Sequence, residues 1–168
     1  MSWLPHRQVL AGLGIMAALA VVDACNSGPA LPRGDIASAL ALPTLEADGA
    51  VFDATTLRGK RVLLAFWRPS CPHCLKELPE LEAAVAGQSD VVAVAVMVSG
   101  EREGGLQVAR SHGFTGPVLI DDTGELKRRL GIDKVPWTFV LRADGTAATS
   151  FIGENPSGTL VLALAVAR

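Results

Sequence analysis

Two strongly apolar runs stand out along the chain, at residues 61–67 (RVLLAFW) and 91–98 (VVAVAVMV). Each has the length of a β-strand, and apolar side chains at successive positions are typical of a strand covered on both faces of a sheet. Asp144-Gly145 is a turn signal between two further candidate strands. The predicted strands after the first two are 117–121, 138–142 and 147–152.

Helical spacing follows the first apolar run. Leu75, Leu78 and Leu81 recur within residues 71–87, which favours a helix with one buried face, and Pro79 should kink it. Further helices are predicted over 104–112 (closed by a left-handed Gly113), over 125–130, and from an Asn155-Pro156 cap to about residue 166. Strands alternating with helices, then a hairpin and a helix, predict an α/β layer sandwich.

The chain before the first strand divides into three parts. Residues 1–24 contain an uncharged apolar stretch over 9–22, which is shorter than the roughly 20 residues that span a bilayer and is typical of a signal peptide. Residues 25–42 are rich in Ser, Gly, Pro and Ala, which predicts a tether. The folded domain is expected over 43–168, and it begins with a β-hairpin (44–47 and 50–52) around Asp48-Gly49.

The end of the signal stretch, Val22-Asp23-Ala24-Cys25, resembles the cleavage box of bacterial lipoprotein signals. Asp23 departs from that pattern, in which a small uncharged residue is usual. Lipidation of Cys25 would anchor the domain to a membrane. Cleavage after Ala24 by the ordinary signal peptidase, and an uncleaved anchor, stay open as alternatives. Each of them places the domain outside the cytoplasm, in the periplasm or on the outer face of the cytoplasmic membrane.

Composition excludes several classes of function. The chain has 168 residues, of which 49% are hydrophobic, and a net charge of -2. It can therefore form one domain with a hydrophobic core, and it shows no basic excess of the kind that nucleic-acid binding needs. Three cysteines are too few for a four-cysteine zinc site or a disulfide scaffold. We expect no metal, no other cofactor and no nucleic-acid partner.

Cys71-Pro72-His73-Cys74 is the motif with the clearest chemistry. It follows a predicted buried strand and opens a helix, where unpaired N–H groups and the helix dipole stabilise a thiolate. Cys71 is therefore the predicted nucleophile, and a protonated His73 would strengthen the effect. Cys74, nearly one turn further on, is expected to be shielded and to act as the resolving thiol. Pro72 fits a position whose N–H would be unpaired anyway. The redox-active disulfide is the only cofactor that this chemistry requires.

Residues 66–74 (FWRPSCPHC), followed by Glu77 and Pro79, resemble the active-site stretch of thioredoxin-fold proteins, and more narrowly of the TlpA/ResA-type membrane-anchored group. The resemblance covers about residues 43–168. It implies a thioredoxin fold, in which helices flank a central mixed β-sheet and the N-terminal hairpin is an extension. Three further segments match, namely Gly59-Lys60-Arg61, Leu130-Gly131-Ile132 with Val135-Pro136, and residues 139–145 (FVLRADG).

By this resemblance, Pro136 should be cis and lie against the dithiol, which exposes the Val135 backbone for pairing with a substrate segment. Trp67 is expected to form a wall beside the dithiol, and Trp137 either lines a substrate groove or sits in the core. The residues predicted to contact substrate are Trp67, Pro72, His73, Val135 and Trp137.

Two departures from the family pattern carry information. Thioredoxins have a buried Asp six residues before the first cysteine, where this chain has Ala65. Glu77, three residues after Cys74 and on the same helix face, is the predicted substitute as proton acceptor and donor. The Pro-His pair between the cysteines matches the strongly oxidising DsbA proteins, and a more stable thiolate raises the reduction potential.

The resulting prediction is an extracytoplasmic thiol–disulfide oxidoreductase that exchanges disulfides with exported proteins. The family resemblance implies a reductase, acting in cytochrome c or metal-site maturation and recharged by a membrane electron donor. His73 favours the alternative of a DsbA-like thiol oxidase. A copper-binding chaperone that uses the same two thiols is a third possibility, with His112 as the candidate extra ligand.

Overall fold

The computed structural model describes residues 30–46, 49–98 and 102–168, and Leu31–Arg168 form one compact unit. Two short 3-10 helices precede an alternation of strands and α-helices. In chain order the elements are η2 (Ala37–Leu40), η3 (Ala54–Leu57), β1 (Arg61–Trp67), α1 (Pro72–Val85), β2 (Val91–Met97), α2 (Arg102–Ser111), β3 (Val118–Ile120), α3 (Glu125–Arg129), β4 (Trp137–Leu141), β5 (Ala147–Ile152) and α4 (Ser157–Val166).

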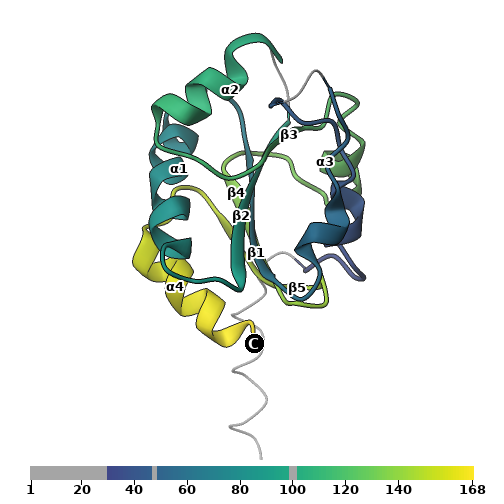
Figure 1. Ribbon diagram of the computed structural model, residues 1–168, viewed down its shortest axis with the longest axis vertical. Coiled ribbons are helices and arrows are strands. Elements are labelled where there is room, and N and C mark those ends of the chain that lie inside the picture. Colours follow the sequence, from purple (N-terminus) through teal and green to yellow (C-terminus); the bar gives the residue numbers. More distant parts are fainter. Residues whose placement is uncertain (1–29, 47–48, 99–101) are drawn as a thin grey trace, which may run out of the picture. The chain divides into compact units, whose positions relative to one another are not determined.

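The five strands form one mixed sheet in the order β3-β2-β1-β4-β5 (Figure 1). β1 runs parallel to β2, and β2 runs parallel to β3, whereas β4 is antiparallel to both β1 and β5. All seven residues of β1 are buried, as expected for a central strand covered on both faces. The predicted α/β fold, a central mixed sheet flanked by helices, is confirmed.

Helices cover the two faces of the sheet unequally. Alternate residues of β1 point to opposite sides, so that Ala65 and Trp67 pack with residues of α1, α2 and α4, whereas Leu64 and Phe66 pack with residues of η2, η3 and α3. Figure 1 shows α1, α2 and α4 together on one side of the sheet and α3 on the other. The dithiol helix α1 therefore lies against the same face as α4.

The chain joins the domain earlier than the sequence predicts. Ile36 and Leu40 are 2% and 0% exposed and belong to the core cluster on the α3 side of the sheet. The N–H of Ile36 also donates to the carbonyl of Gly145, in the turn between β4 and β5, at 2.9 Å. The prediction of a tether over residues 25–42 is thus wrong for its last part. An Ala-rich stretch that reads as flexible carries two apolar side chains at helical spacing, and these cover the sheet.

The predicted N-terminal hairpin is reduced to isolated bridges. Pro43 pairs with Val51, and Thr44 pairs with Leu119 of β3, in both cases antiparallel. The N–H of Ile120 donates to the carbonyl of Pro43 at 2.9 Å. This short segment thus lies along the outer edge of β3 and covers backbone groups that an edge strand would leave unpaired.

The predicted signal peptide (residues 1–24) and the predicted lipidation site Cys25 lie outside the described residues. No helix in the described part of the chain is long and apolar enough to cross a membrane. Cleavage and lipidation therefore stay predictions.

The Arg61 side chain links β1 to α4 by a hydrogen bond. It is 9% exposed, and its guanidinium donates to the carbonyl of Leu164 in α4 at 2.6 Å and to Asp90 at 2.7 Å. We expect Arg61→Met to lower the free energy of unfolding by about 2 kcal/mol, because it removes a charged donor from a buried carbonyl. Urea unfolding measures the loss. Asp90→Asn should cost less because Asp90 is exposed, and equal effects of the two changes would contradict this account.

Candidate active site

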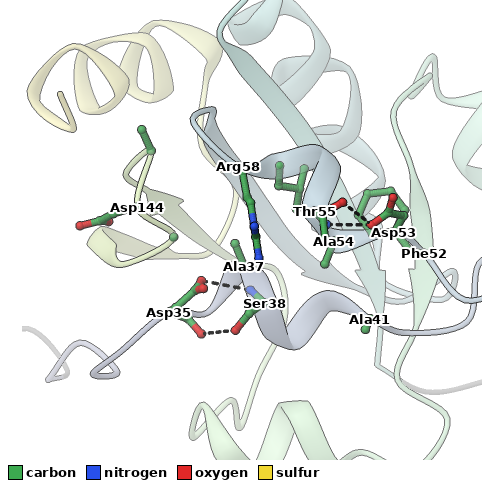
Figure 2. Close-up of a pocket in the computed structure, with 13 residues that line it drawn as sticks. Asp35, Ala37, Ser38, Ala41, Phe52, Asp53, Ala54, Thr55, Arg58 and Asp144 are labelled. Atoms are coloured by element: carbon green, nitrogen blue, oxygen red, sulfur yellow. Dashed lines mark hydrogen bonds between the residues drawn. The ribbon is translucent and has the colours of Figure 1, made fainter.

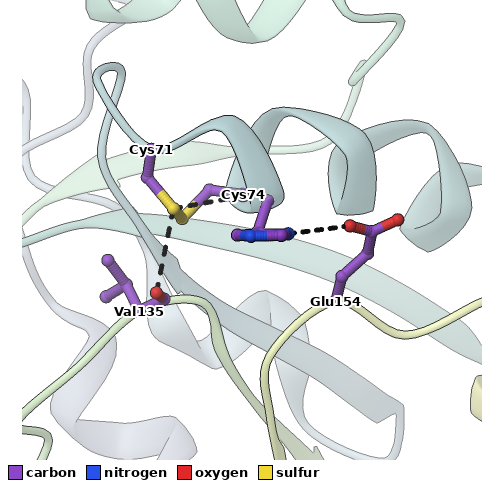
Figure 3. The surroundings of a disulfide bond; sticks show 5 residues. Cys71, Cys74, Val135 and Glu154 are labelled. Carbon is purple, nitrogen blue, oxygen red and sulfur yellow. Dashed lines mark hydrogen bonds and ion pairs between the residues drawn. A yellow bond between two sulfur atoms is a disulfide. The ribbon is translucent and has the colours of Figure 1, made fainter.

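The two cysteines lie where β1 gives way to α1. Cys71 is the N-cap residue of α1, with an extended backbone (φ -102°, ψ 105°), and Pro72 opens the helix. The N–H of Cys74 donates to Sγ of Cys71 at 3.2 Å, and the two sulfur atoms form a disulfide with the Cα atoms 5.2 Å apart (Figure 3). The unpaired N–H groups and the positive end of the helix dipole thus face the Cys71 sulfur, which favours its thiolate once the disulfide is reduced.

The two sulfur positions differ in exposure. Cys71 is half-buried, whereas Cys74 is 1% exposed and belongs to the core cluster under α1. An incoming disulfide can therefore reach Cys71 but not Cys74. This asymmetry suits an attacking Cys71 and a resolving Cys74, the roles that the sequence predicts.

The segment before β4 lies against the dithiol. The Val135–Pro136 peptide bond is cis, which confirms that part of the prediction. Sγ of Cys71 lies 3.7 Å from the carbonyl oxygen of Val135 (Figure 3), where a reduced thiol could donate to it. Pro136 is buried and Val135 is half-buried. Val135 is therefore partly accessible from the surface, while its carbonyl lies next to the Cys71 sulfur.

His73 lies outside the dithiol and faces a carboxylate. Its Nδ1 is 3.1 Å from Glu154, in the loop between β5 and α4 (Figure 3). Lys76 lies 3.8 Å from the same carboxylate. The His73 side chain is 69% exposed, so this pair contributes little to stability. The pair matters for the dithiol instead, because it places a histidine and a carboxylate beside the first turn of α1.

Glu77 is a buried carboxyl one turn after Cys74 on α1, and it is 1% exposed. Burial raises its pKa from the ordinary value of 4.5 to about 7, and a repulsive Glu154 adds to the rise. A hydrogen bond from the side chain of Asn155 at 2.9 Å opposes this rise. Thr138 faces the same carboxyl and also lowers its pKa. Its hydroxyl makes no hydrogen bond of normal geometry with a described residue, so Asn155 is the stronger of the two partners of the carboxyl. A group that titrates near neutral pH can both accept and donate a proton.

The contact between Asn155 and Glu77 is not predictable from the sequence. The sequence predicts Asn155 as the cap of the last helix, but α4 begins at Ser157 after Pro156 as N-cap, with no side-chain cap bond from that residue. Glu80 of α1 accepts the Ser157 N–H at 2.6 Å instead. The amide of Asn155 is therefore available to Glu77, which lies 78 positions away along the chain. No local pattern signals such a pair.

The position that carries a buried Asp in thioredoxins is filled without a charge. Ala65 of β1 is 1% exposed and pairs across the sheet with Thr138 of β4, which is fully buried. Both residues thus lie on the face that α1 covers. The only carboxyl that the described residues place in this buried layer, beneath the N-terminal half of α1, is that of Glu77. Its role as the substitute for the missing Asp stays a prediction.

The two tryptophans are core residues. Trp67 is 1% exposed and packs in the cluster that contains Cys74, so it backs the dithiol from inside. Trp137 is 6% exposed and belongs to the cluster on the opposite face of the sheet, where its ring stacks on Phe139 with centroids 5.9 Å apart. Trp67 thus lies where the sequence predicts a wall beside the dithiol, and Trp137 takes the core position of its two alternatives. Contact of either ring with substrate stays a prediction. Both are strand residues in apolar runs, and such residues pack into the core.

A groove of about 680 Å³ opens beside the exposed side of the site. Its walls come from α1, the cis-proline segment, the end of β5 and the loop between β5 and α4, and they combine apolar residues with charged side chains of both signs. The lining residues are His73, Glu80, Lys134, Val135, Pro136, Ile152, Gly153, Glu154 and Pro156. Of the predicted substrate contacts, His73 and Val135 line it, and Pro72 is exposed at the helix start.

A second hollow, of about 570 Å³, lies between the segment around η2, η3 and the β4–β5 turn (Figure 2). Its carboxylates are already engaged in local structure. Asp53 accepts the N–H of Thr55 at 3.0 Å, which lowers the pKa of Asp53, and Asp35 accepts the N–H of Ser38 at 3.0 Å. No residue of the dithiol site lines this hollow, and we assign it no function.

Metal binding finds no support in the geometry. Within the described ranges, no three His, Cys, Asp or Glu side chains are grouped to hold a metal ion. His112, the predicted extra copper ligand, lies at the end of α2 with its Nδ1 2.9 Å from the carbonyl of Val108. Nothing here favours the copper chaperone over the redox interpretation.

Comparison with known families and proteins agrees with this geometry. The model of the Redoxin family matches residues 28–164. The sporulation thiol-disulfide oxidoreductase A of Bacillus subtilis is 31% identical over 101 residues, which are 57% of this chain and 61% of that protein. The thiol-disulfide oxidoreductase ResA of Oceanobacillus iheyensis is 30% identical over 119 residues, which are 70% of this chain and 59% of that protein. The chain thus matches about three fifths of the length of these relatives.

Solved structures show the same architecture. A secreted Mycobacterium tuberculosis disulfide oxidoreductase, described as homologous to Escherichia coli DsbE, superposes with a TM-score of 0.65 at 28% identity. The match covers 74% of this chain and 92% of that one. The resemblance to the TlpA/ResA type of thioredoxin-like protein is confirmed.

Proposed function

Since this chain belongs to the Redoxin family, we propose that it is a thiol–disulfide oxidoreductase that works outside the cytoplasm and reduces disulfides in exported proteins. One observation carries the proposal above the others. A partly exposed Cys71 and a buried Cys74 form a disulfide at the N-terminus of α1, the arrangement that separates an attacking thiol from a resolving one. The relatives named as thiol-disulfide oxidoreductases support it.

The reaction proceeds in two exchanges. The Cys71 thiolate attacks one sulfur of a client disulfide, the client S–S bond breaks, and the second client sulfur leaves as a thiolate that takes up a proton. Cys74 then gives its proton to Glu77 and attacks the Cys71 sulfur of the mixed disulfide. The client sulfur leaves with the electron pair, and the Cys71–Cys74 disulfide forms. The client gains two electrons, which an electron donor at the membrane must restore to the dithiol.

The groove beside the dithiol, which His73 and Val135 help to line, suits a client segment bound in extended form. The Val135 backbone borders both the Cys71 sulfur and the groove, so a client segment can pair with it as an added strand while its disulfide meets Cys71. By family resemblance, the clients are proteins of cytochrome c or metal-site maturation.

The direction of electron flow is tested by the reduction potential. Equilibration of the protein with glutathione or dithiothreitol buffers, followed through the fluorescence of the buried Trp67, measures it. A reductase requires a value near that of thioredoxin, about -270 mV. A value near that of DsbA, about -120 mV, would favour instead the thiol oxidase that His73 suggests.

The location is part of the same proposal. The structural relative from Mycobacterium tuberculosis is described as secreted, and the apolar stretch over residues 9–22 followed by Cys25 suits an exported, lipid-anchored protein. Mass spectrometry of the mature N-terminus tests the anchor. Diacylglycerol on Cys25 is the expected result, and an unmodified N-terminus after Ala24 would overturn it.

His73 should raise the reduction potential, because an imidazole beside the first turn of α1 stabilises the Cys71 thiolate, and hence the reduced form, whenever the ring carries a proton. We expect His73→Gln to lower the potential by roughly 30 mV, a tenfold change in the equilibrium constant, at low salt. The shift should shrink at high ionic strength, because the His73 side chain is exposed and salt screens its charge. Lys76→Gln, on the same helix face, is the control for a simple loss of positive charge. An equal shift in that variant would contradict a specific effect of His73.

A further inference from the structure

The loop between β5 and α4 touches three separate parts of the dithiol site. The N–H of Gly153 donates to the carbonyl of the cis-proline at 2.9 Å. Glu154 pairs with His73 at 3.1 Å (Figure 3), and Asn155 donates to Glu77 at 2.9 Å. Three consecutive residues thus contact three parts of the site. Gly153 contacts the cis-proline segment, Glu154 contacts the exposed side of α1 at its first turn, and Asn155 contacts the buried side of α1.

Asn155 makes the buried contact, and its orientation is fixed. The residue is 9% exposed, and its side-chain nitrogen donates both to the Glu77 carboxyl at 2.9 Å and to the carbonyl of Gly153 at 2.6 Å. A backbone carbonyl only accepts hydrogen bonds, so the atom that faces it must be the NH₂ group rather than the amide oxygen. Asn155 therefore presents a donor to Glu77. A donor stabilises the carboxylate over the protonated acid.

We propose that Asn155 is a positioning residue for the dithiol reaction, whose amide holds the buried Glu77 carboxyl in place and keeps it able to take the proton of Cys74. This inference rests on the proposed function, in which Glu77 accepts that proton. It adds the group that makes a fully buried carboxylate usable.

The groups that act on the Glu77 carboxyl come from two segments outside its own helix. Thr138 acts on it from β4, and Asn155 and Glu154 act on it from the loop before α4. Cys74 stands three positions before Glu77 on α1. Burial and Glu154 raise its pKa, and among the groups that lower it the hydrogen bond from Asn155 is the largest. Loss of this bond leaves desolvation without its main opponent, so ionisation must move to higher pH.

Proton transfer from Cys74 connects this balance to a measurable rate. The Cys74 thiol must lose its proton before its sulfur can attack the mixed disulfide, and only an ionised Glu77 can accept that proton. The rate of the second exchange therefore follows the ionised fraction of Glu77. The first exchange, by Cys71, does not involve Glu77.

The two exchanges separate in a reaction of the reduced protein with dithiobis(nitrobenzoate). Attack by Cys71 releases one thionitrobenzoate, and resolution by Cys74 releases a second, so stopped-flow absorbance resolves the two phases from pH 5 to 9. Every protein carries Cys25→Ser, so that only the dithiol reacts. We expect the second phase to rise with a midpoint near pH 7. Asn155→Ala should move this midpoint about one unit higher and slow the phase roughly fivefold at pH 7. The first phase should stay unchanged.

Three further variants separate the possible outcomes. Asn155→Asp has the same shape but no NH₂ donor, so it must shift the midpoint in the same direction, and it carries the test if Asn155→Ala fails to fold. Arg61→Met loosens the other end of α4 and must leave the midpoint in place. Glu77→Gln must abolish the pH step. If Glu77→Gln keeps the step, the proposed role of Glu77 fails. If Glu77→Gln removes the step and both Asn155 variants keep the wild-type midpoint, the inference about Asn155 alone is wrong.

Discussion

Cells that produce the Cys74→Ser protein should accumulate client proteins as disulfide-linked adducts of Cys71. The first exchange needs only Cys71, whose sulfur is partly exposed at the N-terminus of α1. The second exchange needs a thiol beneath it, and a serine hydroxyl is too weakly acidic and too poor a nucleophile to displace the client sulfur. Non-reducing gels and mass spectrometry identify the adducts, and dithiothreitol must release them.

Cys71→Ser is the matched control, because it keeps the buried Cys74 but removes the accessible sulfur. We expect this variant to give no adducts and its disulfide-exchange rate to fall to that of buffer thiols alone. The burial of Cys74 at 1% exposure explains why it should not take over the attack. Adducts that form through Cys74 when Cys71 is absent would reverse the proposed roles. An absence of adducts from both variants would count against client exchange itself.

Much of this site is predictable because its parts are local. The motif Cys71–Cys74, the apolar run before it and the helical spacing after it together predict a dithiol at a helix start, and the structure has Cys71 as N-cap of that helix. The pre-proline position of Val135 is likewise visible in the sequence, and the bond that follows it is cis.

The parts that the sequence does not predict depend on contacts between distant segments. Asn155 stands before a proline, a typical helix cap, yet its amide turns to Glu77 because Glu80 already serves the first N–H of α4. Ile36 and Leu40 lie in an Ala-rich stretch, yet they complete the core on the α3 side of the sheet. In each case tertiary packing overrides the local signal.

The burial of Glu77 has a cost in stability that should be measurable. Its pKa is about 7 in the folded protein and 4.5 as the ordinary value. Between these two pH values the folded state holds a proton that the unfolded state has lost, so its contribution to stability is full below pH 4.5 and falls as pH rises through 7. A shift of this size corresponds to roughly 3 kcal/mol. Glutamine cannot ionise and can still accept the hydrogen bond from Asn155, so Glu77→Gln should be the more stable protein at pH 8.

Urea unfolding of the oxidised proteins at several pH values from 4.5 to 8 tests this prediction, since the difference between wild type and variant isolates Glu77 from other titrating groups. The gain in stability of Glu77→Gln should grow across this range towards roughly 3 kcal/mol. Glu80→Gln is a control of opposite sign, because the hydrogen bonds of Ser157 hold the pKa of Glu80 below its ordinary value, so its removal should cost stability at neutral pH and little in acid. A Glu77→Gln difference that stays constant with pH would show that Glu77 does not ionise in this range. A variant that is more stable at pH 8 yet resolves mixed disulfides more slowly would mean that the carboxyl is kept for chemistry at the expense of the fold.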